Sequence, residues 1–460
     1  MGTARGGGTG EAIALTRLAL PIIMARIGLT LMLVVDNMMV GHYGTADLAA
    51  FSLGLSLVHT MQTVGLGLLL GGMVEISGAF GRGSLAECGR IWRRSMGYAL
   101  VIGAIGLGLT MGAEWLYLSL DQAPDLAHSA ARITAIFAWS LPPMLVYLAT
   151  IMLLESVGRP YVGVWLLLGA NVVNLVLNQV LVFGLFDLPG LGALGAAWAT
   201  LIARLILAGS AVGYVLWLMP ERHGLGRAAR ADHAWAPGAR QRRIGYAEGL
   251  SMGMESGAFA VMVIFAGQLG ALDLASYSIA INLNMLLFML AVGVGGASAV
   301  RVAQAYGRQD AAGMARTGWS GVGVYAGLMG VVSAVFLTIP ETITALYTTD
   351  PALTAAARPL VALVGIVVLI DGSQRVVANI LRGYGEAWAP TTAHLIAYLV
   401  VMIPLGYYLG VALGHGSLGL ILAIVVASVV ATILLFSRFI WLAARPPFFH
   451  PKPEGTWASS

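Results

Sequence analysis

The chain has 460 residues, of which 58% are hydrophobic and only 10% are charged. Soluble globular proteins carry about 25% charged residues, so this composition excludes a soluble protein and indicates an integral membrane protein. The formal net charge is +4, but no DNA- or RNA-binding motif accompanies it, and no nucleic-acid partner is expected. The single cysteine, Cys88, excludes an internal disulfide and a cysteine-based zinc site.

Hydrophobic runs predict twelve membrane spans, since a spanning helix needs about 20 mostly apolar residues. They lie at 14–40, 48–77, 95–118, 129–154, 161–185, 193–219, 244–267, 274–300, 317–339, 354–381, 390–410 and 417–443. The predicted fold is therefore an all-α integral membrane protein with about twelve transmembrane helices. The predicted domains are a flexible cytoplasmic N-terminus (1–13), a first six-helix lobe (14–219), a cytoplasmic linker (220–243), a second lobe (244–443) and a cytoplasmic C-terminal tail (444–460).

Basic residues concentrate on one side of the predicted membrane. The N-terminus, every second connection and the C-terminal tail hold eighteen Lys and Arg, whereas the alternate connections hold none. By the positive-inside rule, both termini are expected in the cytoplasm. Within the spans, the arginines expected are Arg26, Arg204 and Arg375.

The two halves of the chain repeat each other. GHYGTADLAAFS at Gly41 matches GQLGALDLASYS at Gly267, a shift of 226 residues, and the same shift aligns AFGRG with AYGRQ. Because six helices return the chain to its starting side, the lobes should be related by a pseudo-twofold along the membrane normal. This architecture places a substrate site between the lobes near the midplane.

Asp36 lies alone in the apolar run LMLVVDNMMVG of the first span. A carboxylate at this depth costs about 2.5–3.5 kcal/mol and usually marks an ion or substrate path. In the fifth span, Asn171, Asn174 and Asn178 share one helical face, and with Asp36 they suit either Na⁺ or an acid that gains and loses a proton. The alternative is that these asparagines only form hydrogen bonds that hold neighbouring helices together. Met262 is the counterpart of Asp36 in the second lobe, so the acid does not repeat.

Glu255 and Asp371 are the corresponding acids of the second half, in the seventh and tenth spans. Gln374 follows Asp371 by one turn, and protonation of either acid would be a plausible switch. The alternative is an ion pair with a buried arginine, for which Arg375, one turn beyond Asp371, is the nearest candidate. Glu75 is less informative, because it is expected near a helix end where solvent explains it.

Other residues could line a pathway. Pro21 removes a helical hydrogen bond in the first span and could bend that helix. Phe288 and Met289 in the eighth span offer an adaptable apolar surface to a ligand. Methionine, however, more commonly packs against lipid without a role in binding. HExxH, GxSxG and P-loop motifs are absent from the sequence, so an enzyme or an ATP-driven pump is not expected.

A proline in the first span followed by VDNMMVGHYGTADLAA resembles the opening of multidrug and toxic compound extrusion (MATE) transporters of the NorM branch. QAYGRQD and LRGYGEAWAPT are similar to cytoplasmic connections of that family. The resemblance implies a V-shaped pair of lobes in which Pro21 bends the first helix and Asp36, with Asn174 and Asn178, is the coupling site of the first lobe.

The same resemblance implies that Glu255 and Asp371 take part in Na⁺ binding in the second lobe. One departure concerns position 367, where some NorM relatives have a tyrosine and this chain has Val367. This departure leaves proton coupling open, so Na⁺ is expected either at Asp36 or at Glu255 and Asp371, or H⁺ takes its place.

The sequence thus predicts a monomeric secondary active efflux transporter in a bacterial inner membrane. It would exchange small cationic, amphipathic, drug-like compounds for Na⁺ or H⁺, with no other cofactor. A lipid-linked oligosaccharide flippase of related fold is the second candidate, although its cavity needs more basic residues than the spans provide. A membrane-embedded lipid-modifying enzyme is the third.

Overall fold

The computed structural model describes residues 8–120, 122–184, 189–226 and 236–445, and the regular elements within these ranges are all helices. Eleven helices are long and apolar enough to cross a membrane, and a bent pair raises the number to twelve. The predicted all-α fold with about twelve spans is therefore confirmed.

In its described residues, the first lobe, called the N-lobe, contains eight α-helices and one π-helix. They are α1 (Gly8–Tyr43), α2 (Thr45–Gly81), α3 (Leu85–Thr110), α4 (Ala113–Ser119), α5 (Pro124–Trp139), α6 (Leu141–Ser156), α7 (Pro160–Phe183), α8 (Ala193–Gly213) and the π-helix η1 (Tyr214–Leu218). The bent pair is α3 and α4, which meet at 49° and occupy the predicted third span. Helices α5 and α6 meet at Ser140, two residues before Pro142, and form one span.

The second lobe, called the C-lobe, begins after two short 3-10 helices, η2 (Arg222–Leu225) and η4 (Ala236–Gly238). Its α-helices are α9 (Ala239–Leu269), α10 (Ala271–Gly307), α11 (Ala311–Thr338), α12 (Pro340–Ala345), α13 (Pro351–Gly383), α14 (Trp388–His394), α15 (Ile403–Gly406) and α16 (Gly416–Ala444). Two π-helical stretches, η5 (Leu395–Met402) and η6 (Tyr407–Ala412), interrupt the eleventh span.

The predicted domain ends differ from the observed helices at two points. Helix α1 already begins at Gly8, and Glu11 in the predicted flexible N-terminus forms a 2.7 Å ion pair with Arg301. Helix α9 begins at Ala239, inside the predicted linker. The remainder of the predicted N-terminus (1–7), the middle of the linker (227–235) and residues 446–460 of the predicted tail lie outside the described residues.

The repeat is visible as a matching contact in each lobe. Asp47 at the start of α2 accepts a 2.9 Å hydrogen bond from the backbone N–H of Ala193, which begins α8. Asp273 at the start of α10 accepts the equivalent 2.7 Å bond from Ser417 near the start of α16. In both lobes, the aspartate of the repeated Asp-Leu-Ala sequence accepts a hydrogen bond from a backbone N–H at a helix N-terminus, where such donors lack intrahelical partners.

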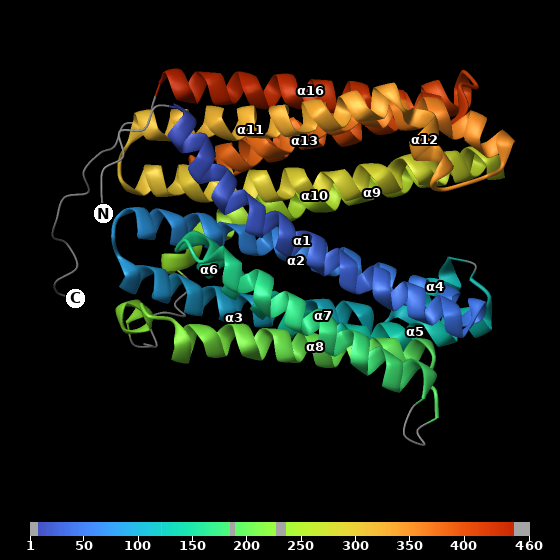
Figure 1. Ribbon diagram of the computed structural model, residues 1–460, viewed down its shortest axis with the longest axis horizontal. Helices are drawn as coiled ribbons and strands as arrows, with labels where there is room; N and C mark the ends of the chain where they lie inside the picture. Colours follow the sequence, from blue (N-terminus) through green and yellow to red (C-terminus); the bar gives the residue numbers. More distant parts are fainter. Residues whose placement is uncertain (1–7, 121, 185–188, 227–235, 446–460) are drawn as a thin grey trace.

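The lobes lie side by side, with α1 running obliquely between them (Figure 1). Leu15 and Ile22 of α1 belong to the hydrophobic core of the C-lobe, whereas Met32 belongs to that of the N-lobe. The helix is continuous through Pro21 and changes direction along its length. Helix α1 is therefore packed on both lobes at once.

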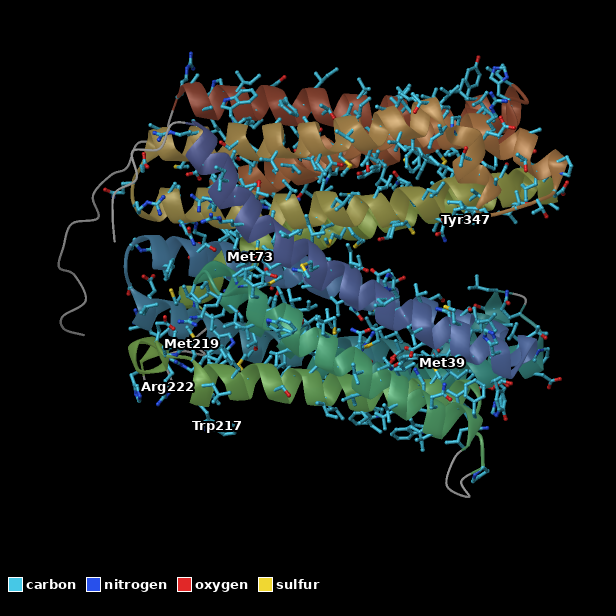
Figure 2. The ribbon with its side chains drawn as sticks, in the orientation of Figure 1. Met39, Met73, Trp217, Met219, Arg222 and Tyr347 are labelled. Carbon is cyan, nitrogen blue, oxygen red and sulfur yellow. The ribbon has the colours of Figure 1, made fainter. Side chains whose placement is uncertain are left out.

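Glycines bring the lobes together at the end that carries the chain termini (Figure 1). A Cβ atom added to Gly67 of α2 would lie 2.9 Å from the Cα atom of Gly249 on α9. Gly78 and Gly307 approach each other similarly between α2 and α10. Small residues permit such close backbone contact between membrane helices. Figure 2 places Met73 of α2 where the lobes meet, while Trp217 points away from the protein with 74% of its surface exposed.

Candidate functional site

Asp36 is fully buried in the N-lobe among uncharged hydrogen-bond donors. Asn178 Nδ2 of α7 donates to Asp36 Oδ1 over 2.6 Å, and Thr200 Oγ1 of α8 donates to Asp36 Oδ2 over 2.6 Å. Asn174 links the two donors, because it accepts a 3.2 Å hydrogen bond from Asn178 and donates a 3.4 Å hydrogen bond to Thr200. A buried carboxyl group with only neutral donors can change its charge without breaking an ion pair.

The helical spacing of α7 explains which asparagines reach Asp36. Asn174 and Asn178 are one turn apart and both face α1 and α8. Asn171 instead donates to the carbonyl oxygens of Leu167 (2.8 Å) and Gly28 (3.2 Å), so its role is the alternative one of joining helices. Thr200 was missed by the sequence reasoning, because a threonine in an apolar helix carries no signal that distinguishes a site from a packing position.

Arg204 lies one turn beyond Thr200 on α8 and is buried. Its Nη1 donates a 2.8 Å hydrogen bond to Ser140, at the break between α5 and α6. The guanidinium is close enough to Asp36 to attract it electrostatically, although the two groups do not bond directly. Asp36 thus feels a positive potential while keeping neutral partners.

Asp371 in the C-lobe also has neutral partners. It accepts hydrogen bonds from Ser428 of α16 (2.9 Å) and from Gln374 (3.2 Å). Gln374 Nε2 also donates to Tyr398 (2.9 Å) in the π-helix η5, and its Oε1 lies 2.7 Å from His394 Nε2. π-helical segments often occur at functional sites. The ion pair between Asp371 and Arg375, which was the alternative suggested by the sequence, is not formed.

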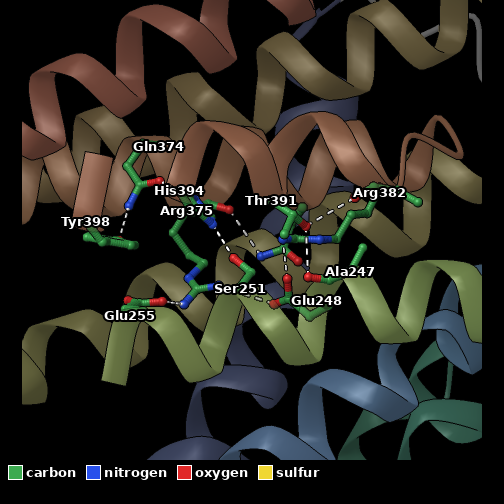
Figure 3. Close-up of polar contacts among 12 residues, drawn as sticks. Ala247, Glu248, Ser251, Glu255, Gln374, Arg375, Arg382, Thr391, His394 and Tyr398 are labelled. Carbon is green, nitrogen blue, oxygen red and sulfur yellow. Dashed lines mark hydrogen bonds and ion pairs between the residues drawn. The ribbon is translucent and has the colours of Figure 1, made fainter. Parts of the chain in front are cut away.

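Arg375 instead joins two glutamates of α9 (Figure 3). Its Nη2 contacts Glu255 Oε2, and its Nη1 lies 3.2 Å from Glu248 Oε1. Glu248 also pairs with Arg382, which is fully buried and lies about two turns beyond Arg375 on α13. The ion-pair alternative is therefore correct for Glu255 and wrong for Asp371. We call Glu248, Glu255, Arg375 and Arg382 the C-lobe charge cluster.

The sequence reasoning did not single out Glu248 or Arg382. Glu248 lies seven residues before Glu255, and this two-turn spacing was a usable sign that both acids share a face of α9. Arg382 was expected in a connection, but α13 extends to Gly383. The expected set of span arginines was too small, because membrane-length helices also contain ten others: Arg17, Arg132, Arg240, Arg242, Arg243, Arg301, Arg316, Arg358, Arg382 and Arg438.

The predicted pathway residues lie in different surroundings. The guanidinium carbon of Arg375 is 5.2 Å from the ring centre of Phe288, within the range of a cation–π contact. Met289 is half-buried on α10, and Pro21 is buried within α1. Only Phe288 of these three therefore contacts a charged candidate residue.

A small cavity of about 40 Å³ lies between the lobes beside the charge cluster. Arg26 of α1 contributes one charge to its wall and forms a 3.5 Å ion pair with buried Glu155. The wall combines charged and polar groups with flexible apolar side chains, and it includes Arg26, Leu66, Leu70, Met73, Met152, Glu248, Met252, Arg375 and Asn379. Side chains of these kinds suit molecules that are apolar over most of their surface and carry one charge. The space present holds only a few water molecules, so a drug would enter only after the lobes separate.

The fold and these sites define a multi-pass membrane transporter with two similar lobes around a central cavity. The MatE family model matches the chain twice, at residues 21–180 and 249–408, once in each lobe. The chain therefore belongs to the MATE family of transporters, and it is not an enzyme.

Relatives and solved structures agree with this assignment. The chain is 36% identical over 432 residues to "Probable multidrug resistance protein NorM" of Caulobacter vibrioides, covering 93% of this chain and 91% of the relative. A protein of the same description from Xanthomonas campestris is 30% identical, with 92% of both chains covered. The crystal structure of the eukaryotic MATE transporter AtDTX14 superimposes with a TM-score of 0.87 at 19% identity, over 95% of this chain and 96% of that one.

Proposed function

We propose that this protein is a secondary active multidrug efflux transporter, which exports small cationic, amphipathic compounds in exchange for H⁺ or Na⁺. The related chains described as multidrug resistance proteins support the export of drug-like compounds. The distribution of basic residues supports a bacterial inner-membrane protein with both termini in the cytoplasm, and we propose that it acts as a monomer.

The burial of Asp36 among neutral donors is the observation that carries this proposal. When the carboxyl group gains or loses a cation, the hydrogen bonds from Asn178 and Thr200 must adjust. Asp36 lies on α1, and this helix packs on both lobes. A change in charge at one side chain can thereby alter the relative energies of two lobe arrangements, which is what alternating access requires.

The central cavity supplies the drug-binding part of the mechanism. Its methionines can adapt to molecules of different shape. Competition between the coupling cation and the drug would then need no direct contact, since Asp36 acts through the position of α1. We propose Asp36, Asn174, Asn178, Glu255 and Asp371 as coupling residues, and Pro21, Phe288, Met289 and Gln374 as residues of the pathway or its bending helix.

Export by purified protein in proteoliposomes tests this function. A fluorescent cationic dye is followed with a pH gradient alone and then with a Na⁺ gradient alone. Asp36→Asn should abolish gradient-driven export while the protein still folds, because the amide has nearly the same shape. Asp125→Asn, which changes an exposed acid near the start of α5, is the matched control and should export normally. Unchanged export by Asp36→Asn would contradict the proposal.

A further inference from the structure

The guanidinium group of Arg375 lies between two carboxylates that are two turns apart on one helix face. Glu248 and Glu255 are seven residues apart on α9, and each bonds to a different nitrogen of Arg375. All three side chains are buried, and Figure 3 shows Arg375 reaching across from α13 to both acids. The ring of Phe288 covers the guanidinium carbon at 5.2 Å.

An alkali cation is bound by several oxygen atoms that converge on one point. The carboxylate of Glu255 already has a cationic partner, because Arg375 supplies both a positive charge and hydrogen-bond donors. Glu248 is further neutralised by Arg382. A second cation at Glu255 would have to approach a fixed positive charge in a medium that screens it weakly.

The two acids that the family resemblance would assign to a shared Na⁺ site have separate partners in this chain. Glu255 is bonded to Arg375, whereas Asp371 accepts its hydrogen bonds from Ser428 and Gln374. Position 367, on the same helix, is Val367 and offers no side-chain oxygen. The residues present therefore do not fit a Na⁺ ion held jointly by Glu255 and Asp371.

From this arrangement we infer that Arg375 is a built-in counter-ion, which takes the place of Na⁺ at Glu255 and makes the C-lobe insensitive to Na⁺. This inference rests on the proposed antiport function and identifies Arg375 as the residue that sets ion specificity there. Arg375 is then a positioning residue, because it acts by holding Glu255 and Glu248 and not by contacting the transported ion.

Removal of the guanidinium should create a response to Na⁺ that the native C-lobe lacks. In Arg375→Gln, two buried carboxylates lose their shared cation, and Na⁺ can bind between them. The full-length protein in lipid nanodiscs is heated in NaCl or in choline chloride at equal ionic strength. In an Asp36→Asn background, which removes the other candidate Na⁺ site, the parent protein should melt at the same temperature in both salts. Adding Arg375→Gln should lower the melting temperature in choline and raise it by about 2 °C or more in NaCl, with saturation.

Two further variants separate a specific site from general destabilisation. Arg375→Lys keeps a positive charge between the glutamates and should remain insensitive to Na⁺. The double variant Arg375→Gln, Glu255→Gln should lose the gained response, because one of the two carboxylates is gone. A folded Arg375→Gln protein that melts identically in both salts would overturn the inference.

Binding of radioactive Na⁺ to the native protein provides a test that does not depend on any variant folding. The expected result is no saturable binding that depends on Glu255. Saturable binding that disappears in Glu255→Gln would overturn the inference while leaving multidrug export intact. Conversely, a failure of dye export would contradict the proposed function without changing either measurement of Na⁺.

Discussion

Thr200 donates a 2.6 Å hydrogen bond to Asp36, although 164 residues separate them in the chain. The bond connects α8 to α1 and matches the 2.6 Å bond that Asn178 donates from α7 to the other carboxylate oxygen. Each carboxylate oxygen of Asp36 thus accepts a hydrogen bond from a different helix of the N-lobe. Any cation that neutralises Asp36 competes with both donors, so the strength of these bonds should affect transport.

Thr200→Val should lower the gradient-driven export rate by about tenfold. Valine has the shape of threonine but lacks its hydroxyl donor, and a hydrogen bond to a charged group contributes about 1.5–3 kcal/mol. The measurement is initial dye export in proteoliposomes at equal protein density. Asn171→Ala is the control, because Asn171 lies on the same face of α7 but bonds only to backbone carbonyls, and its rate should stay within about twofold of native. Equal rates for native protein and Thr200→Val would contradict the prediction.

The sequence allowed the spans, the repeat and part of the N-lobe site to be predicted, because these depend on periodicity along one chain. Asn178 could be placed near Asp36 from helical spacing and from the family resemblance. The partner of Arg375 could not be predicted, because Asp371 is one turn away on the same helix and was the obvious choice. In the structure, Asp371 is already satisfied by Ser428 and Gln374, and the long arginine side chain reaches across to α9.

Positions that depend on packing between helices were likewise hidden from the sequence. Tyr398 reaches Gln374 from a π-helical stretch, which no hydrophobic pattern indicates. Glu75 was attributed to solvent near a helix end, but it forms a 3.1 Å ion pair with Arg240 of α9 and so joins the two lobes. In both cases the partner belongs to another helix, and helix orientation decides the contact.

The ion pair of Glu248 and Arg382 should show strong coupling in a double-mutant cycle. Both side chains are almost completely buried, and removal of one partner from a buried pair costs about 3–5 kcal/mol. Arg382→Met and Glu248→Gln should each lower the unfolding temperature clearly. The double variant should be less destabilised than the sum of the two, because no unpaired charge remains. Additive losses would show that the two groups act independently.

The ion pair of Arg159 and Glu221 lies outside the membrane spans and should give a small, pH-dependent contribution to stability. A 2.6 Å hydrogen bond from Arg159 lowers the pKa of the Glu221 carboxyl group below its ordinary value of 4.5. Because the folded-state pKa is depressed, the stabilisation is present above that ordinary value and is lost as the pH falls through the folded value.

Glu221→Gln should therefore reduce stability slightly at pH 7, by less than about 1 kcal/mol because the pair is partly exposed. The difference from native should vanish once the pH has fallen below the depressed pKa of the Glu221 carboxyl group. Unfolding temperatures from pH 3 to 8 provide the measurement. The control is Glu341→Gln, whose pair with Arg358 is exposed on both sides and should contribute nothing measurable. A difference that persists in acid would rule out this ion pair as its source.

Gly67→Ala should push the lobes apart at the end that carries the termini. The added methyl group would lie 2.9 Å from the Cα atom of Gly249, a backbone atom that cannot rotate away. Overpacking of this kind costs about 1–3 kcal/mol, and 1.4 kcal/mol changes a population ratio tenfold. Spin labels at Ser84→Cys and Arg308→Cys, after replacement of Cys88 by serine, report the distance between the lobes. The distribution should move toward longer distances in Gly67→Ala and remain native in Gly209→Ala, where a methyl group meets nothing within 4 Å.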